Sequence, residues 1–419
     1  MAGVEIVTIG NELLLGFTID TNAAWLARQL SEVGIEVVRR ASVGDAGEDI
    51  VEAVRTALDR TGAVITTGGL GPTADDITKP AIADLFGRDL YFDDAQWEHI
   101  RTLWRTRRGT EPPEVNRQQV MLPVGCHVLT NRHGTAPGIW LEDERGRWVA
   151  MLPGVPREMR GIYTDELGPR LSHRVGATVP PIRSTTVRTT GIAESSLPER
   201  LGDAARGVDG LSLAYLPGQE GVDLRLTARG LAADEAERRL ATAADVLVER
   251  VGSPVYGRGS CDLAEVVLQA CRAGAHTIAV AESCTGGMLG ERLTAVAGSS
   301  DVFLGGVIAY ANGVKETLLH VAPTVIESQG AVSLEVARAM AAGARSRTGA
   351  TIGIGITGVA GPGGGSPEKP VGTVCIGVDI SGTEPVAIRG QMIGDRAEIR
   401  FRATQAALDL VRRRLAGLH

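Results

Sequence analysis

Short apolar runs alternate with stretches of helical periodicity at the start of the chain. This pattern predicts strand 4–10, helix 21–34, strand 36–40, helix 48–61 and strand 63–67. Strands that alternate with helices indicate parallel βαβ units and a doubly wound sheet. The glycine-rich stretch 68–72 directly follows the third strand. An open α/β sheet has its binding crevice at such a position, so we expect a binding site there.

The pattern changes in the middle of the chain and later returns to α/β alternation. The predicted order over 184–256 is β-α-β-β-α-β, the ferredoxin-like motif, with its first helix at 195–205. From about residue 261 helices and strands alternate again, and a late strand pair precedes a closing helix over 396–416. The Pro-containing stretch 178–181 is typical of a linker. We predict two doubly wound α/β sandwich domains joined by a small ferredoxin-like α+β domain, with boundaries 1–170, 171–257 and 258–419.

Charge and cysteine content limit the partners and the compartment. The 419 residues include 43 Lys and Arg against 50 Asp and Glu, a formal net charge of −7, and 4% are aromatic. Neither a strong basic field nor rows of base-stacking rings are therefore expected. The 5 cysteines are scattered without a CxxC pair, which fits a reducing cytosol. No apolar run reaches the length of a membrane span, so we expect a cytoplasmic protein with no membrane and no nucleic-acid partner.

The stretch 68–76, GGLGPTADD, combines two features of an anion site. Glycines let backbone N–H groups approach an anion, and Thr73, Asp75 and Asp76 suit the start of a helix, with a capping role for one of them. Two adjacent carboxylates repel a phosphate unless a divalent cation lies between them, which indicates Mg²⁺ or a similar ion. A glycine-rich turn with a helix cap explains the same residues without a ligand.

The stretch 281–293, AESCTGGMLGERL, places Ser283 beside Cys284 at the expected end of a strand. Gly286 and Gly287 would leave the N-terminus of the next helix open to an anion or an oxyanion. A serine nucleophile still needs a base, and this motif contains no His.

Lys315 and Tyr310 offer a base and a proton relay. A partly desolvated Lys near a Ser can act as general base, as in the Ser-Lys variants of acyl transfer. Cys284 is intrinsically the better nucleophile, but a Lys partner suits a hydroxyl, so we predict Ser283 as nucleophile and Cys284 as its packed or oxyanion-side neighbour. Thr357, in a glycine-rich loop, adds a second backbone cradle for a phosphate. A surface Lys with a strand-end Tyr and a mobile loop are the alternatives.

The first part of the chain carries five motifs: IGNELLLGFTIDTN, VVRRASVGD, TTGGLGPTADDIT, NRHGTAPG and LPGVPREM. They resemble the N-terminal domain of the competence/damage-inducible CinA family, and the resemblance covers essentially the whole chain. That domain is similar to molybdopterin-binding domains and is associated in the family with metal-dependent hydrolysis of ADP-ribose to AMP and ribose 5-phosphate.

This resemblance implies roles for individual residues. The implied substrate contacts are Gly68, Gly69, Gly71, Thr73, Asn22, Thr135, Pro153 and Gly154. The implied holders of a metal or its water are Asp75 and Asp76, with Glu12 or Asp20. The expected cation is Mg²⁺, Mn²⁺ or Co²⁺, with K⁺ as a further candidate. Asn11 stands where the family often has Asp or Thr, so we do not expect it to be essential.

The last part of the chain carries ESCTGG, YANGVKETLL, SLEVARAMAAG and GVAGPGGGSPEKPVGTV, all intact. They resemble the nicotinamide mononucleotide deamidase domain of CinA proteins, which implies conversion of nicotinamide mononucleotide and water to nicotinic acid mononucleotide and ammonia without a cofactor. The implied catalytic residues are Ser283, Lys315, Tyr310 and Thr357. The implied substrate contacts are Cys284, Thr285, Gly286, Gly287, Gly358, Gly361, Gly363, Arg396 and Arg400. Arg396 and Arg400 lie one helical turn apart and either face the phosphate or form a solvated helix face.

The leading interpretation is a bifunctional hydrolase of pyridine-nucleotide metabolism. Its expected partners are nicotinamide mononucleotide and ADP-ribose, with NAD-like dinucleotides as a further hypothesis, and the family resemblance implies a homodimer. One alternative is a nucleotide- or molybdopterin-binding competence protein without catalysis in the N-terminal domain. Another is molybdenum cofactor biosynthesis, which would depend on fold resemblance alone.

Overall fold

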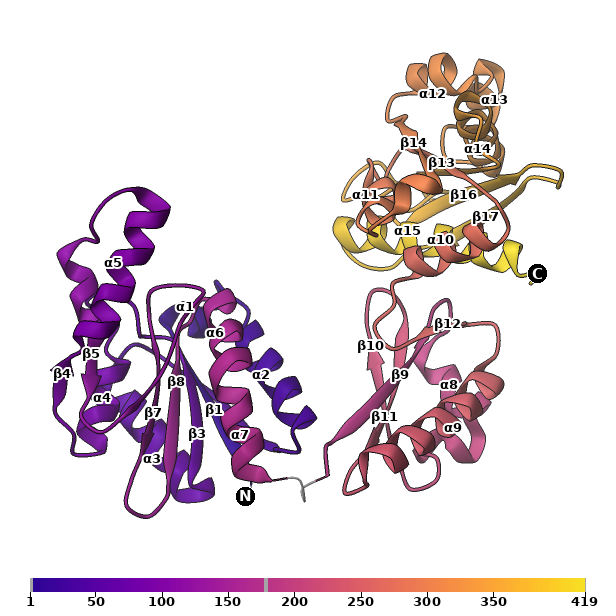
Figure 1. Ribbon diagram of the computed structural model, residues 1–419. Coiled ribbons are helices and arrows are strands. Elements are labelled where there is room, and N and C mark those ends of the chain that lie inside the picture. The colour runs from indigo at the N-terminus through magenta and orange to yellow at the C-terminus, as the bar shows by residue number, and fades with distance from the viewer. Residues whose placement is uncertain (1–2, 177–179, 419) are drawn as a thin grey trace. The chain divides into compact units, whose positions relative to one another are not determined.

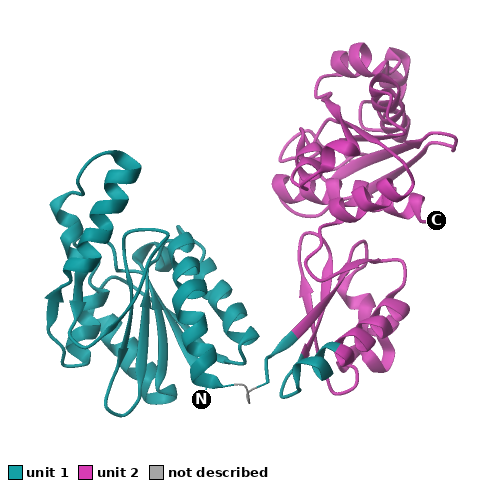
Figure 2. Ribbon diagram, in the orientation of Figure 1, with its two compact units in different colours: residues 1–183, 228–237 teal, residues 184–227, 238–419 magenta. Residues whose placement is uncertain are grey.

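The structure is a computed structural model that describes residues 3–176 and 180–418 (Figure 1). Two compact units make up the chain: residues 1–183 with 228–237, and residues 184–227 with 238–419 (Figure 2). The predicted α/β fold class is confirmed, including the small ferredoxin-like part. Positions 178 and 179 of the predicted linker lie outside the described residues, and the predicted domain boundaries stay predictions.

The first unit is built on a six-stranded sheet in the order β2-β1-β3-β8-β7-β6. Its strands are β1 Val4–Ile9, β2 Val37–Val43, β3 Ala63–Thr67, β6 His127–Leu129, β7 Gly138–Glu142 and β8 Trp148–Leu152. Strands β2, β1, β3 and β8 are parallel, whereas β7 is antiparallel to both neighbours. Strands β1, β3 and β8 are buried throughout because separate apolar clusters pack on the two faces of the sheet.

Helices flank both faces of this sheet (Figure 1). They are α1 Asn11–Leu14, α2 Thr21–Glu32, α3 Gly47–Thr61, α4 Thr78–Leu85, α5 Asp94–Arg108, α6 Pro156–Ile162 and α7 Gly168–Val175. A 3₁₀ helix, Glu114–Val120, and a π-helical turn, Tyr163–Leu167, complete the helical elements, and β4 Leu90–Phe92 pairs with β5 Met121–Pro123. The arginines of α5 lie on a solvated face, where Arg101 and Arg105 form ion pairs with Glu98 and Glu111.

The ferredoxin-like part has a four-stranded sheet in the order β10-β11-β9-β12. Its strands are β9 Arg183–Thr189, β10 Ser212–Pro217, β11 Val222–Ala228 and β12 Val255–Arg258, and its long helix is α9 Ala233–Val251. The single helix expected at 195–205 is wrong. Instead a 3₁₀ turn, Glu194–Ser196, precedes α8 Leu197–Leu201, and a second 3₁₀ turn, Gly202–Arg206, follows. Helix α8 ends because Gly202 has a left-handed φ of 60°.

The last part contains a five-stranded sheet in the order β14-β13-β15-β16-β17. Its strands are β13 Ile278–Glu282, β14 Phe303–Ile308, β15 Ile352–Gly358, β16 Thr373–Ile380 and β17 Val386–Gln391. The first three are parallel and the last two antiparallel, so the predicted late strand pair is confirmed. The helices are α10 Leu263–Ala273, α11 Met288–Thr294, α12 Asn312–Leu319, α13 Pro323–Gln329, α14 Leu334–Thr348 and α15 Arg396–Leu415, with a 3₁₀ turn at Ser299–Asp301.

Close packing of α14 on β15 fixes this second sandwich. A Cβ atom on Gly355 would lie 2.3 Å from the carbonyl oxygen of Ala337, and one on Gly353 would lie 1.9 Å from that of Ala341. The glycines of β15 therefore let the helix backbone approach the sheet. Among the described residues, no helix is both long and apolar enough to cross a membrane.

Candidate functional sites

The loop after β3 is built on two glycines that no other residue could replace. Gly68 has φ 113° and a Cβ there would lie 2.1 Å from the carbonyl oxygen of Ile9. Gly69 has φ 66° and its Cβ would lie 2.0 Å from Oγ1 of Thr78. Strain from the left-handed backbone adds to these steric conflicts. The loop is therefore pressed against β1 and α4 in one conformation.

Asp76 holds this loop, and its role differs from the prediction. Its carboxylate accepts hydrogen bonds from the N–H of Gly71 (2.7 Å), the N–H of Thr73 (2.8 Å) and the hydroxyl of Thr73 (2.5 Å). Helix α4 begins later, at Thr78, after Ile77, which makes no side-chain cap. The expected helix cap from Thr73, Asp75 or Asp76 is therefore wrong. Because Gly71 and Thr73 donate to Asp76, their N–H groups are occupied in this conformation.

Three predicted contacts converge beside the loop. The side-chain nitrogen of Asn22 donates to the carbonyl of Gly154 (2.7 Å) and to Oγ1 of Thr67 (3.2 Å), and Thr67 donates to the carbonyl of Pro153 (3.0 Å). The amide oxygen of Asn22 is buried without a hydrogen-bond partner. This unused acceptor is suited to a donor on a ligand.

Carboxylates surround a cavity of about 400 Å³ at this loop. Five of them line it: Glu12, Asp45, Asp75, Asp76 and Glu158. No Lys and no Arg are among the described residues of its wall. Thr135 also lines this cavity. The hydroxyl of Thr73 lowers the pKa of the Asp75 carboxyl below its usual value. At neutral pH this cavity is therefore strongly negative.

The four predicted metal ligands do not form one coordination set. Asp20 lines a neighbouring cavity with Glu12 and caps α2 by accepting the N–H of Ala23 (2.9 Å). Within 3–176 and 180–418 no three His, Cys, Asp or Glu side chains are arranged to hold a metal ion.

Lys79 is a feature of this region that the sequence pattern did not reveal. Its side chain is 1% exposed, and its ammonium donates to the carbonyl of Gln118 (2.6 Å). Burial lowers its pKa to about 8, although Asp76 opposes the shift. In the sequence, a single charged residue within an apolar helix repeat does not indicate that its side chain is buried.

The second candidate site is a pocket of about 200 Å³ in the last sandwich. Its wall includes Ser283, Tyr310, Lys315, Thr357 and Arg396, so the structure brings together the predicted catalytic residues. Ser283 follows β13 and is 8% exposed. Its hydroxyl makes no hydrogen bond to another described residue.

Glu282 corrects the expectation of an open helix N-terminus. Its buried carboxylate accepts the N–H groups of Gly287 (3.0 Å), Leu289 (3.0 Å) and Gly290 (2.8 Å). The start of α11 is therefore already neutralised by a carboxylate of the chain. The sequence showed Glu282 at the strand end, but its spacing to these N–H groups depends on the tight turn over 283–287.

Two backbone donors remain beside Ser283. Among the described residues, the N–H groups of Cys284 and Thr285 donate to no other residue. The hydroxyl of Thr285 is also buried without a partner. The oxyanion donors closest in sequence to Ser283 are thus these two groups, and the N–H of Gly287 is excluded because Glu282 binds it.

Lys315 is buried at the back of the pocket. It is 1% exposed, and its Nζ donates to the carbonyl oxygens of Ala309 (2.9 Å) and Tyr310 (3.1 Å). Burial lowers the pKa of Lys315, and the nearby Cys284 opposes this shift in part. The expected interaction of Lys315 with Ser283 is not a direct hydrogen bond in this conformation.

Cys284 is a packed neighbour of Ser283. Burial raises the pKa of its thiol to about 11, and Glu282 contributes to the rise. A Cβ on Gly358 would lie 3.1 Å from its Sγ, so this glycine makes room for the thiol. At neutral pH Cys284 is therefore a thiol, the less nucleophilic form.

Of the remaining predicted residues, Thr357, Gly358 and Arg396 line the pocket, whereas Arg400 and Gly361 contact residues beside it. Thr357 donates from Oγ1 to the carbonyl of Ala331 (2.7 Å). Arg396 donates to the carbonyl of Gly361 (2.5 Å) and to the hydroxyl of the exposed Tyr310 (3.3 Å). Arg400 donates to the carbonyl of Thr285 (2.7 Å), and its guanidinium lies within 3.6 Å of the position that a Cβ on Gly286 would take. Gly363 does not line the pocket but has open space around it.

A larger cavity of about 920 Å³ lies elsewhere in the second unit, beside Thr190 and Gln405. Its wall is mostly apolar, and none of its described residues is Ser, Cys, Lys or His. We therefore assign chemistry to the smaller pocket.

Comparisons with known proteins agree with this architecture. Three domain families match the chain: the probable molybdopterin binding domain at 5–173, the damage-inducible protein CinA KH domain at 184–257 and the CinA C-terminal domain at 260–415. A CinA-like protein of Gemmatimonas aurantiaca is 60% identical over 99% of this chain and 96% of its own length. A putative competence-damage inducible protein of Moorella thermoacetica is 44% identical over 98% of each chain.

Solved structures include the protein CinA of Thermoplasma acidophilum, which is 34% identical over 39% of this chain and 94% of its own, with a TM-score of 0.36. With the near-full-length identity to curated relatives, the matches to all three parts show that the chain belongs to the CinA family.

Proposed function

We propose that the C-terminal pocket hydrolyses the amide of nicotinamide mononucleotide to nicotinic acid mononucleotide and ammonia. The observation that carries this proposal is the hydroxyl of Ser283, which bonds no other described residue and lies in one pocket with a buried lysine. A low dielectric around Lys315 favours its neutral amine, which is the form that accepts a proton.

The hydrogen bonds of Lys315 suit this role. A neutral amine retains two N–H bonds for the carbonyls of Ala309 and Tyr310 and leaves its lone pair free. Ser283 attacks the amide carbon while its proton passes to Lys315, and the N–H groups of Cys284 and Thr285 stabilise the oxyanion. The intermediate then releases ammonia with the proton from Lys315, and water hydrolyses the acyl-enzyme by the same route.

Arginines at the mouth of this pocket bind the phosphate in the proposed complex. Arg396 lies exposed in the wall, and Arg400 lies one turn further along α15. Guanidinium groups pair with phosphate in a bidentate manner, so no metal ion is needed there. The hydroxyl of Tyr310 is held by Arg396 and orients the substrate at the entrance.

For the N-terminal crevice we propose metal-dependent cleavage of the pyrophosphate of ADP-ribose to AMP and ribose 5-phosphate. The oxygen donors fit Mg²⁺, Mn²⁺ or Co²⁺, because such ions are often bound by one or two carboxylates and completed by substrate phosphates. Glu12 and Asp75 are the candidates to hold the ion, whereas Asp76 fixes the loop. When bound, the cation neutralises the phosphates and lowers the pKa of a bound water. Asn22 offers its unused amide oxygen to a substrate hydroxyl. K⁺ remains a further candidate.

The test measures both products with the full chain. We expect ammonia from nicotinamide mononucleotide in wild type and none above background in Ser283→Ala. Equal release from both proteins would refute the assignment of Ser283. We expect AMP from ADP-ribose with Mg²⁺ and its loss with a chelator, and AMP from NADH would extend the activity to dinucleotides.

A second candidate function is nucleotide or molybdopterin binding without catalysis in the N-terminal unit. The match of residues 5–173 to the probable molybdopterin binding domain family favours this candidate. Molybdopterin that copurifies with the chain, together with no AMP formation, would establish it.

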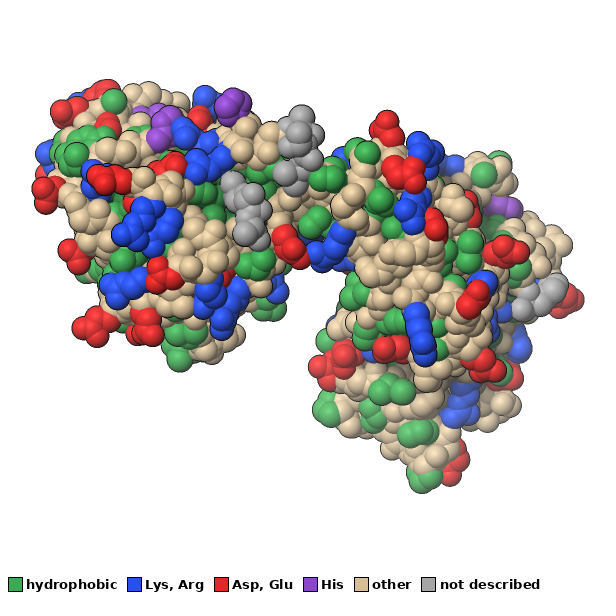
Figure 3. All heavy atoms as spheres, turned by 90° about the horizontal axis from the view of Figure 1, so that it is seen from below, with side chains coloured by type: hydrophobic (Ala, Val, Ile, Leu, Met, Phe, Trp, Pro, Cys, Tyr) green, Lys and Arg blue, Asp and Glu red, His purple; other side chains and the backbone are tan. Residues whose placement is uncertain are grey.

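We propose that the chain binds the two nucleotides and a second copy of itself, as a cytoplasmic homodimer, and that it does not bind nucleic acid. The match to a KH domain suggests nucleic acid, but both GxxG segments within it, 207–210 and 218–221, contain an acidic residue in an ion pair. Asp209 pairs with Arg239, and Glu220 pairs with Arg188. On the face drawn in Figure 3, Lys and Arg alternate with Asp and Glu instead of forming a continuous basic patch.

A further inference from the structure

Helix α15 contacts both the deamidase pocket and the ferredoxin-like part of the same unit. Its first turns carry Arg396 and Arg400, which reach the loops around the pocket. Gln405 lies five residues beyond Arg400, about 7.5 Å along the helix axis. Displacement of the helix at Gln405 would therefore be transmitted to both arginines.

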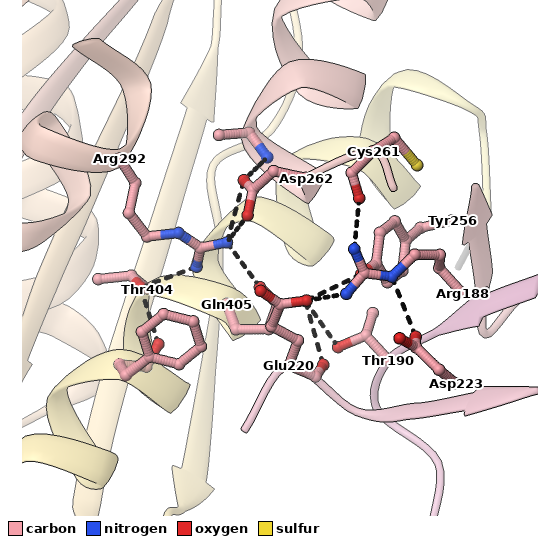
Figure 4. A network of polar contacts seen from close by, with 12 residues as sticks. Arg188, Thr190, Glu220, Asp223, Tyr256, Cys261, Asp262, Arg292, Thr404 and Gln405 are labelled. Carbon is pink, nitrogen blue, oxygen red and sulfur yellow. Dashed lines mark hydrogen bonds and ion pairs between the residues drawn. The ribbon is translucent and has the colours of Figure 1, made fainter. Parts of the chain in front are cut away.

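Both the oxygen and the nitrogen of the Gln405 side-chain amide form hydrogen bonds (Figure 4). Its oxygen accepts a hydrogen bond from Arg292 (2.9 Å). Its nitrogen donates to Oγ1 of Thr190 (3.3 Å) and to the carbonyl of Glu220 (3.1 Å), both in the ferredoxin-like part. The side chain is 3% exposed. A buried amide with every partner satisfied fixes the position of its helix more strongly than an exposed one.

Arg292 extends this contact to the turn that carries Ser283. It lies on α11, which directly follows that turn, and it donates to Oγ1 of Thr404 (3.0 Å) and to Asp262 (3.1 Å). Its guanidinium also lies 4.7 Å from the ring centre of Phe401. Helix α11, which follows the turn of Ser283, and helix α15, which carries Arg396, are thus joined through one buried guanidinium.

The loop that contains Glu220, to which Gln405 donates, is itself held in place. Arg188 forms an ion pair with Glu220 and also bonds Asp223 (3.0 Å) and the carbonyl of Cys261 (2.7 Å) (Figure 4). The backbone carbonyl that accepts from Gln405 therefore belongs to a loop tied to the sheet and to the segment before α10.

We propose that Gln405 is a positioning residue for the substrate phosphate: by docking α15 on the ferredoxin-like part, it holds Arg396 and Arg400 where they bind the phosphate of the mononucleotide. This inference rests on the proposed deamidase function. It assigns the ferredoxin-like part a role in substrate affinity. Chemistry at the amide depends on Ser283 and Lys315, which lie on other elements. Arg292 also bonds Thr404 and Asp262, which hold it in place without Gln405, so we expect Gln405 to affect binding and not the chemical step.

The experiment compares nicotinamide mononucleotide with nicotinamide riboside, which has the same amide but no phosphate. For Gln405→Leu in the full chain we expect KM for the mononucleotide to rise about tenfold with kcat within about twofold, since couplings between sites are typically 1–3 kcal/mol. We expect kcat/KM for the riboside to stay within about twofold of wild type. Gln405→Glu keeps the acceptor for Arg292 but loses both donations, so it should behave similarly. Gln269→Leu removes an exposed glutamine of α10 that bonds only Glu265 among the described residues, and it is the matched control.

Equal losses on both substrates, or a loss in kcat at unchanged KM, would overturn the proposal. If Gln405→Leu does not fold, Thr190→Val tests the same contact from the other side, with an expected rise in KM of about threefold. If wild type releases no ammonia, the proposed function fails, and calorimetric binding of nicotinamide mononucleotide decides the role of Gln405. About tenfold weaker binding by the variant then supports it, whereas equal binding, or no binding by either protein, overturns it.

Discussion

The two candidate sites of this protein face the same ligand charge with opposite side chains. Five carboxylates line the N-terminal crevice, and no Lys or Arg is among the described residues of its wall. The C-terminal pocket has Arg396 in its wall, and no Asp or Glu is among the described residues of that wall. A phosphate can therefore bind directly in the second site, whereas in the first it needs a cation.

The backbone N–H groups of the two sites also differ in whether they are available to a ligand. In the N-terminal loop, the chain's own Asp76 takes up the N–H groups of Gly71 and Thr73. In the C-terminal turn, Glu282 takes up the N–H groups of Gly287, Leu289 and Gly290, whereas those of Cys284 and Thr285 donate to no other described residue. Backbone donors are thus available beside Ser283, whereas Asp76 occupies two of those in the glycine loop, so we propose oxyanion stabilisation for the former and carboxylate-metal chemistry for the latter.

Reciprocal variants test this division with the largest expected effect. Ser283→Ala should lower ammonia release by about 10³-fold or more, because it removes the nucleophile, while AMP formation from ADP-ribose stays within about twofold. Asp75→Asn should do the reverse, because it removes one of the two proposed cation ligands. Both products are measured on each full-length variant. Loss of both activities in either variant would mean that the two sites are not independent.

The backbone of the glycine loop should tolerate substitution poorly. Gly68→Ala should reduce AMP formation by about 10²-fold and the free energy of unfolding by about 3 kcal/mol, because its Cβ would lie 2.1 Å from the carbonyl of Ile9. Ammonia release should be unchanged. The control is Gly47→Ala at the start of α3, where the nearest atom would lie 3.8 Å from the new Cβ. Chemical denaturation and the AMP assay measure both, and a fully active Gly68→Ala would contradict the packing argument.

Much of this division could be predicted from sequence, because it depends on local order. The strand before Gly68 and the strand before Ser283 were predicted from apolar runs, and the structure places both motifs at the carboxyl ends of buried strands. The roles of Glu282 and Asp76 could not be predicted, since a carboxylate next to an N–H in sequence reaches it only when the turn between them closes. The burial of Lys315 and Lys79 depends on packing between distant elements, which periodicity does not report.

The pH dependence should separate the sites further. Burial lowers the pKa of Lys315 below 10.5, so its neutral fraction rises with pH through a range below the usual lysine titration. We therefore expect kcat/KM for deamidation to rise with pH and level off below pH 10.5. AMP formation depends on carboxylates and not on the Lys315 amine, so it should not rise over the same pH range. The control is Lys315→Met, which should lose most of the activity and the rise of kcat/KM with pH. An unchanged pH profile in this variant would exclude Lys315 as the base.

Cys284→Ala should have the smallest effect and is the sharpest test of the nucleophile. With a thiol pKa raised to about 11, only about one thiol in ten thousand is ionised at pH 7. Ala preserves the backbone N–H that we assign to the oxyanion, so kcat/KM for deamidation should stay within about threefold. The free energy of unfolding should fall by about 1 kcal/mol because a buried sulfur is lost. If deamidation instead falls by about 10²-fold or more while Ser283→Ala remains active, the nucleophile is the thiol. The C-terminal site would then need a mechanism that ionises Cys284 against its burial, and the proposed role of Lys315 as base for a hydroxyl would no longer hold.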